Sequence, residues 1–212
     1  INTEKKLVKY LDIPIQHIDS DILKRMNRKS DENSIKSLVD RIREKIPDIT
    51  IRTTLITGFP GETEEQFSKL HQFVKDTRFD RLGCFPYSAE EDTVAGEMPD
   101  QIDEQTKVDR MEHIMESQMT VSAENNEKCN GKVYEVLIEG YDDYIKCYFG
   151  RREADAPEID GKVFQGHVGR VFGDVHADHE GQQGQRGGHR PDGRVRYCQR
   201  IGRVLPDGFD GR

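Results

Sequence analysis

Short β-branched apolar runs alternate with amphipathic segments between Leu7 and Ser88, and this alternation limits the possible folds most strongly. The runs lie at residues 5–16, 49–59 and 81–88 and predict three buried strands. Between them, apolar residues recur at helical spacing. Strands that alternate with helices of about 10 to 15 residues favour parallel β/α units. The sequence therefore predicts an α/β fold for this part of the chain.

Capping residues mark where the helices begin. Asp19 or Ser20 precedes a short helix, Asp31 starts a second helix that ends before Pro47, and Thr63 opens a third. A long helix is expected over residues 103–128 as a packing arm. Its predicted apolar face consists of Val108, Met111, Ile114, Met115 and Met119.

The pattern changes to all-β near residue 129. Residues 131–151 alternate in hydropathy, and turn-forming residues at 140–143 predict a β-hairpin. We therefore expect one domain at residues 1–128 and a second, partial β domain at residues 129–164.

From Gln165 onward the amino-acid usage shifts abruptly. This stretch holds eleven glycines and no Lys, Ser or Thr, so its side chains with a permanent positive charge are all Arg. The shift falls before the β domain has enough strands to close, so we interpret residues 165–212 as an aberrant tail produced by a frame shift. A genuine, disordered Gly/Arg-rich tail that binds RNA is the alternative.

Composition excludes several classes of protein. The net charge of −8 disfavours a general nucleic-acid binder and suits a basic protein partner. No apolar run approaches the roughly 20 residues of a membrane span, and the start at Ile1 shows no signal peptide. Four widely spaced cysteines suit reduced thiols in the cytoplasm. We expect a cytoplasmic protein, and the start at Ile1 indicates either that the chain was trimmed or that its gene begins further upstream.

The run RTTLITGFPGETEEQF, residues 52–67, is the strongest local signal. Gly58 and Gly61 permit positive φ and close approach of the backbone to a ligand, and Pro60 fixes the turn. The following helix start offers free N–H groups to an anion. A tight structural connection explains the same pattern, and the Gly-Lys-Ser/Thr ending of a P-loop is missing.

Two further strand ends, DIPIQH and CFPYSAEEDT, are expected at the same edge of the sheet. His17 lies in the first but has no second His or Cys at ligand spacing, so we interpret it as a hydrogen-bonded structural residue. Glu90 and Glu91 are interpreted as solvated. The residues predict no Ser-His-Asp set, no metal site and no catalytic side chain.

These three edges resemble the methylthiotransferase branch of the radical S-adenosylmethionine family. The resemblance covers roughly residues 7–164, through YLDIPIQHIDSDILKRMNR, ITIRTTLITGFPGETEEQF and FPYSAEEDTVAG. Thr53 and Thr54, the acidic pair after YSA and GRREADAPEIDGKVF are similar to enzymes that modify a ribosomal-protein aspartate, rather than to those that modify a tRNA adenosine.

The resemblance implies a fold, a cofactor and a reaction. The fold is half of a TIM-like radical SAM barrel followed by a truncated all-β TRAM domain. A 4Fe-4S cluster would bind S-adenosylmethionine and release a 5′-deoxyadenosyl radical, which abstracts hydrogen from the aspartate β-carbon. The residues implied near S-adenosylmethionine are Gln16, Arg52, Gly58, Pro60, Gly61, Phe85, Pro86 and Tyr87.

The chain departs from the family pattern because it has no CxxxCxxC. The ligands of both clusters are therefore absent from it, and we expect the chain alone to be inactive. The implied partner is a small-subunit ribosomal protein, with the ribosome or RNA as a further partner of the TRAM remnant. A tRNA adenosine methylthiotransferase and a non-catalytic RNA- or ribosome-binding module remain the alternatives.

Overall fold

The computed structural model describes residues 3–4, 6–165 and 194–198. The chain divides into two units, residues 1–125 and residues 126–212. The expected limits at residues 128 and 164 stay predictions, and most of the expected aberrant tail lies outside the described residues. In the described part, no helix is both long and apolar enough to cross a membrane.

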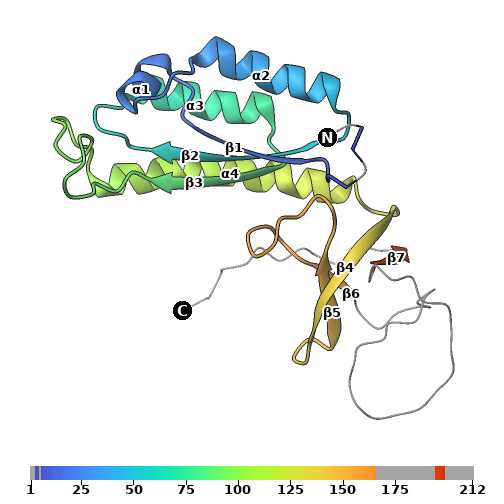
Figure 1. Cartoon of the computed structure of the whole chain (residues 1–212). Coiled ribbons are helices and arrows are strands. Elements are labelled where there is room, and N and C mark those ends of the chain that lie inside the picture. The colour runs from blue at the N-terminus through green and yellow to red at the C-terminus, as the bar shows by residue number, and fades with distance from the viewer. Residues whose placement is uncertain (1–2, 5, 166–193, 199–212) are drawn as a thin grey trace, which may run out of the picture. The chain divides into compact units, whose positions relative to one another are not determined.

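Three parallel strands form the sheet of the first unit. They are β1 (Tyr10–Gln16), β2 (Thr50–Thr57) and β3 (Arg81–Pro86), in the order β1-β2-β3. Register pairs Leu11 with Ile51, and Thr57 with Pro86. All three strands therefore end at one edge of the sheet, as the β/α alternation predicted (Figure 1).

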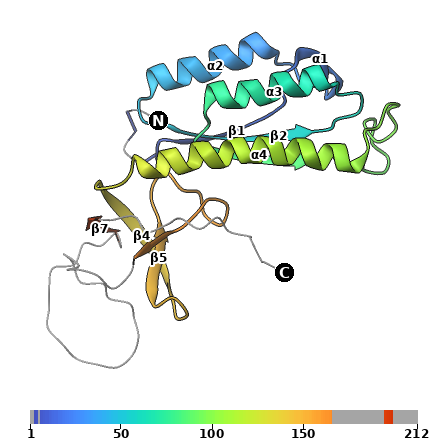
Figure 2. The same ribbon diagram turned by 180° about the vertical axis from the view of Figure 1, so that it is seen from behind.

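Four helices accompany this sheet: α1 (Ser20–Arg25), α2 (Glu32–Lys45), α3 (Glu64–Thr77) and α4 (Glu104–Glu127). The predicted caps are confirmed, since Asp19, Asp31 and Thr63 each accept backbone N–H groups of the first turn. α4 lies behind the sheet in Figure 1 and in front of it in Figure 2.

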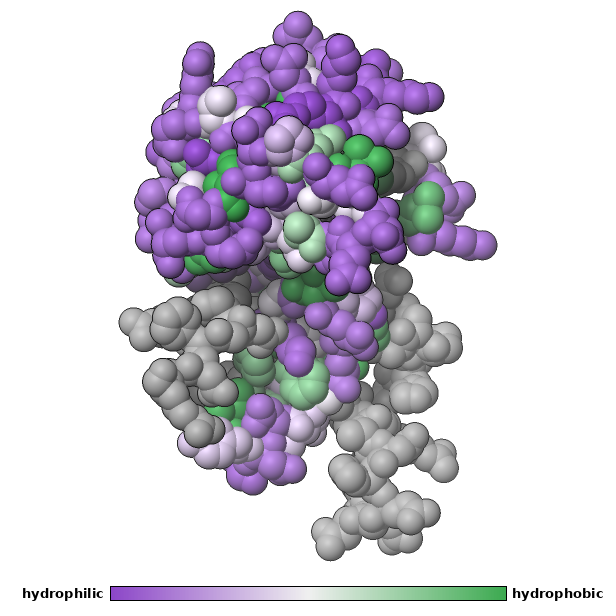
Figure 3. Space-filling model, turned by 90° about the vertical axis from the view of Figure 1, so that its left-hand side faces the viewer, coloured by the Kyte–Doolittle hydropathy of each residue, from purple (hydrophilic) through white to green (hydrophobic). Residues whose placement is uncertain are grey.

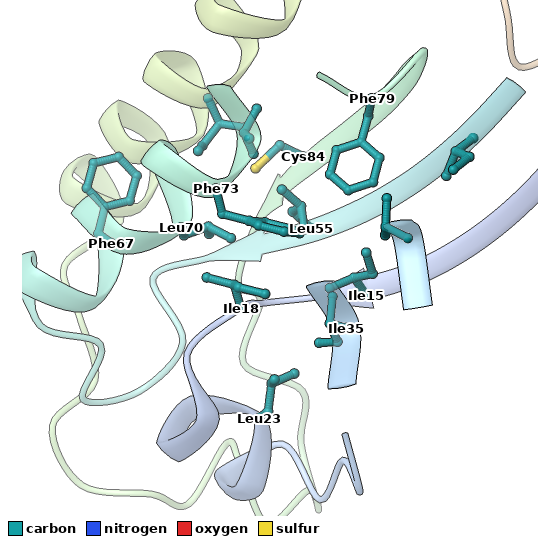
Figure 4. Close-up of a cluster of buried hydrophobic side chains, with 14 of the residues drawn as sticks. Ile15, Ile18, Leu23, Ile35, Leu55, Phe67, Leu70, Phe73, Phe79 and Cys84 are labelled. Atoms are coloured by element: carbon teal, nitrogen blue, oxygen red, sulfur yellow. The ribbon is translucent and has the colours of Figure 1, made fainter. Parts of the chain in front are cut away.

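The two faces of the sheet have different surroundings. Along β2, Ile51, Thr53 and Leu55 are buried, whereas the alternating Arg52 and Thr54 are only half-buried. The buried face packs on the helices and forms one apolar core (Figure 4). In a complete β/α barrel the other face lines the interior, so this alternation agrees with the predicted half-barrel.

The second unit contains an antiparallel sheet with the order β6-β5-β4-β7. Its strands are β4 (Val133–Asp142), β5 (Cys147–Arg151), β6 (Val163–Gln165) and β7 (Arg194–Cys198). The hairpin was predicted correctly, but its turn lies at residues 143–146 rather than 140–143. Gly140 instead sits at an irregularity in β4, where a Cβ would lie 2.6 Å from the Phe149 ring.

Two further details of the sequence prediction were wrong. β1 begins at Tyr10, and Leu7 and Val8 before it are 56% and 47% exposed. On α4, Met119 is 61% exposed, whereas Lys107, Arg110 and Gln118 are buried. The helix buries hydrogen-bonded polar side chains beside Ile114, and an apolar pattern cannot indicate such a face.

We expect Leu55→Ala to lower the free energy of unfolding by about 2–5 kcal/mol, because it leaves a cavity in the core. Leu7→Ala removes the same atoms from an exposed position and should change the free energy of unfolding by less than about 0.5 kcal/mol. Urea denaturation of both variants measures the difference. Equal effects would contradict the assigned core.

Candidate functional site

The C-terminal ends of the three strands meet at one edge. Gln16 pairs with Leu55 in the β1–β2 register, and the Tyr87 N–H donates to the Thr57 carbonyl at 2.8 Å. The turn that begins at Gly58 follows β2 directly. The edge therefore brings together seven of the eight predicted site residues: Gln16, Gly58, Pro60, Gly61, Phe85, Pro86 and Tyr87.

Arg52 lies earlier along β2, in register with Asp12 and Arg81 rather than with the strand ends. Its Nη1 atom donates to Asp12 Oδ2 at 2.6 Å. The guanidinium is on the half-buried face of the sheet, the same face as Phe85. Arg52 is thus placed on the face that an interior ligand would contact, but below the edge.

Left-handed backbone conformations shape this edge. Gly58 and Gly61 have φ values of 70° and 71°, so the Gly-rich pattern correctly indicated positive φ. A Cβ at Gly58 would lie 2.3 Å from Lys107 Cγ on α4. Gln16 also has a positive φ, 72°, which the sequence did not indicate. The backbone at both strand ends is therefore held in unusual conformations.

The aromatic residues at the edge have different exposures. Phe85 is 55% exposed, whereas Tyr87 is 9% exposed and packs edge-on against Phe59 at 5.3 Å. Lys107 Nζ lies 5.4 Å from the centre of the Tyr87 ring. Over the β/α unit, Figure 3 shows hydrophobic residues scattered between hydrophilic ones. Because Phe85 is exposed and Tyr87 is buried, the edge offers the ring of Phe85 as a large apolar surface to a ligand.

A buried polar network lies under the turn. Glu62, 4% exposed, accepts the Gly58 N–H at 3.0 Å and Arg110 Nη1 at 2.8 Å. His17 is fully buried, and its Nδ1 accepts the Asp19 N–H at 2.9 Å, as expected of a structural histidine. The sequence analysis did not single out Glu62. Its partner Arg110, far along the chain, gave no sequence signal.

The edge fits a polar organic ligand better than a metal. Gln16 Oε1 is buried and has no hydrogen-bond partner within the described residues. Among those residues, no three His, Cys, Asp or Glu side chains gather to hold a metal ion. The edge thus offers an unpaired acceptor to a polar ligand, whereas the described part of the chain does not fit an iron–sulfur cluster.

The described cysteines are free thiols in different environments. Burial raises the pKa of Cys84 to about 12 and also raises that of Cys147. Burial acts to raise the pKa of Cys129 too, but hydrogen bonds from Tyr134 and Arg152 outweigh it and lower the pKa overall. Arg152 Nη1 lies 3.3 Å from the Cys129 sulfur.

Family models match both units. The Radical SAM superfamily model matches residues 3–74, and the TRAM domain model matches residues 131–177. Ribosomal protein uS12 methylthiotransferase RimO of Geobacter sulfurreducens is 51% identical over 165 residues, which are 77% of this chain and 37% of that protein. The chain belongs to the radical SAM methylthiotransferase family. Within this family it is RimO-like, as the sequence motifs implied.

Other relatives agree with this membership. RimO of Alkaliphilus oremlandii is 48% identical over 77% of this chain and 37% of the relative. The chain thus spans little more than a third of the length of these curated methylthiotransferases. Among solved structures, coproporphyrinogen III oxidase HemN from Escherichia coli matches 68% of this chain and 41% of its own, with 18% identity and a TM-score of 0.47. The predicted order, a radical SAM α/β part followed by a β-rich TRAM domain, is confirmed.

Gly58→Ala should lower the free energy of unfolding, because Ala disfavours positive φ by about 1–2 kcal/mol and its Cβ would overlap Lys107, adding about 1–3 kcal/mol. Gly131→Ala is the matched control, since its φ is 76° and nothing lies within 4 Å of an added Cβ. Urea denaturation should show the larger loss at Gly58. A larger loss at Gly131 would contradict the close packing of α4 on the turn.

Cys129 should react with iodoacetamide faster than Cys84 and Cys147 at pH 8, because the thiolate is the reactive form and only its pKa is lowered. All three rates should fall as the pH is lowered from 8 towards 6, because each thiolate becomes protonated. Mass spectrometry of peptides from the labelled native protein measures each rate. In urea the three rates should converge, and equal rates in the native protein would refute the assigned environments.

Proposed function

We propose that this chain is part of a radical SAM enzyme that methylthiolates the β-carbon of an aspartate in a small-subunit ribosomal protein. The observation that carries the proposal is the 51% identity to a uS12 methylthiotransferase across both units. The meeting of three strand ends at one edge supports it, because β/α barrels place their active sites at that edge.

The proposed ligand of this edge is S-adenosylmethionine, held by Gln16, Arg52, Gly58, Pro60, Gly61, Phe85, Pro86 and Tyr87. When bound, it supplies the radical chemistry that removes hydrogen from an unactivated carbon. Gln16 Oε1, which lacks a partner in the described residues, is available to accept a hydrogen bond from a polar ligand. The exposed ring of Phe85 offers an apolar surface that excludes water.

Backbone groups complete the proposed contacts. The ring of Tyr87 packs on Phe59 and is almost fully buried, so the residue would contact adenine through its main chain. The absence of side chains at Gly58 and Gly61 permits close approach. These residues bind and orient, while the iron–sulfur clusters are proposed to use ligands outside this chain.

The second unit is the proposed contact for the substrate protein. Residues 131–164 carry eight Asp and Glu against five Lys and Arg, a net charge of −3. An acidic domain attracts a basic protein and repels phosphate, which favours a ribosomal protein over RNA alone. Such a reaction would take place in the cytoplasm.

The test uses the longer protein that contains this segment together with the CxxxCxxC motif, with reconstituted clusters and a reductant. Incubation with S-adenosylmethionine and a sulfide source should add a methylthio group to one aspartate of uS12, detected by mass spectrometry of its peptides. Addition of the methylthio group to tRNA, with none on uS12, would establish the tRNA alternative. Binding to ribosomes or RNA without any transfer would favour the binding-module alternative.

A further inference from the structure

Glu62 stands out because two hydrogen-bond donors and a histidine ring from distant segments meet at its buried carboxylate. The Gly58 N–H donates to Oε2 at 3.0 Å, and Arg110 Nη1 donates to Oε1 at 2.8 Å. His17 Nε2 lies 3.4 Å from Oε2, a contact without hydrogen-bond geometry. These partners come from the turn after β2, from α4 and from the end of β1.

The hydrogen bond at the other nitrogen of His17 sets the direction of this contact. Nδ1 accepts the Asp19 N–H, so the hydrogen of a neutral ring is on Nε2, the nitrogen that lies 3.4 Å from Glu62 Oε2. Arg110 also donates to the Glu62 carbonyl at 3.1 Å and, through Nη2, to Glu64 at 3.1 Å. The Glu62 carboxylate thus accepts hydrogen bonds from Gly58 and Arg110 and lies beside the ring of His17.

The network adjoins the residues proposed to bind S-adenosylmethionine. His17 directly follows Gln16, whose backbone has a positive φ, and Gly58 begins the turn. Side chains of the core do not fix these two backbones, because Gly58 has none and Gln16 is polar. Strand pairing brings the two strand ends together, and the buried carboxylate orients the turn at Gly58 against His17.

We infer that Glu62 is a positioning residue that holds Gln16 and Gly58 in the geometry that binds S-adenosylmethionine, without touching the ligand. Arg110 orients Glu62 from α4. The inference rests on the proposed function for the identity of the ligand. For the positioning it rests on the hydrogen bonds of Glu62 to Gly58 and Arg110 and on its contact with His17.

Glu62→Gln is the decisive variant because it keeps the size of the side chain. The amide group has an acceptor at one end and donors at the other, so either the Gly58 N–H or Arg110 Nη1 faces a donor instead of an acceptor. We expect the Kd for S-adenosylmethionine in the cluster-loaded longer protein to rise on the order of tenfold. Peptides that contain Gln16 and Gly58 should also exchange their amide hydrogens faster in the ligand-free protein.

Glu65→Gln is the matched control, since it makes the same chemical change three residues along the chain, at an exposed position in the first turn of α3. It should leave both the Kd and the exchange rates unchanged. Arg110→Lys, which keeps the charge but loses the fork that holds Glu62, should raise the Kd by a smaller factor. This second variant provides the test if Glu62→Gln does not fold.

The outcomes separate the two proposals. A Glu62→Gln protein with a lowered Tm but the wild-type Kd and exchange rates at the two strand ends would show a purely structural role and overturn the inference. If the wild-type protein does not bind S-adenosylmethionine, the proposed function fails. Faster exchange at both strand ends in the variant would still support the positioning, and unchanged exchange would overturn it.

Discussion

The parallel pairing of β1, β2 and β3 is the constraint on which the rest of the β/α unit depends. Parallel strands require a crossover between them, and each crossover here is a helix or a helix pair whose apolar side returns to the same face of the sheet. The same pairing sends three segments, separated by about 30 to 40 residues of chain, to one edge. Architecture and site placement thus have a common cause.

That arrangement gives the edge two means of support. An apolar core around Leu55 and Phe79 fixes the strands from the helix side. The turn after β2 is held instead by charged and polar groups, because its glycines contribute no side chain to the core. Hydrogen bonds are directional and apolar contacts are not, so the strands are fixed in place by packing and the turn is fixed in orientation by Glu62.

The sequence predicted the features that follow from local chemistry. Helix caps at Asp31 and Thr63, the order of strands and helices, and positive φ at Gly58 were all correct, since each depends on residues that are neighbours in the chain. The motif residues at the strand ends were grouped correctly because parallel strands share an edge. Their role in binding S-adenosylmethionine remains a proposal.

The prediction failed where distant residues decide the outcome. Met119 was assigned to the buried face of α4, but Lys107 and Arg110 are buried instead, because Glu104, Glu62 and Glu64 satisfy their charges. Glu62 and Glu64 lie 48 and 46 residues before Arg110, whereas Glu104 lies three residues before Lys107 on α4 itself, and hydropathy indicates neither kind of pairing. A hydropathy pattern therefore assigns the wrong face of such a helix to the core.

The contact between Gly58 and Lys107 has a consequence for how this family can vary. The side chain of Lys107 occupies the space that any larger residue at position 58 would need, and the left-handed backbone there already disfavours such a residue. A substitution in the turn is therefore tolerable only together with a shorter or redirected side chain on α4. The two positions, on elements far apart in the sequence, are expected to covary during evolution.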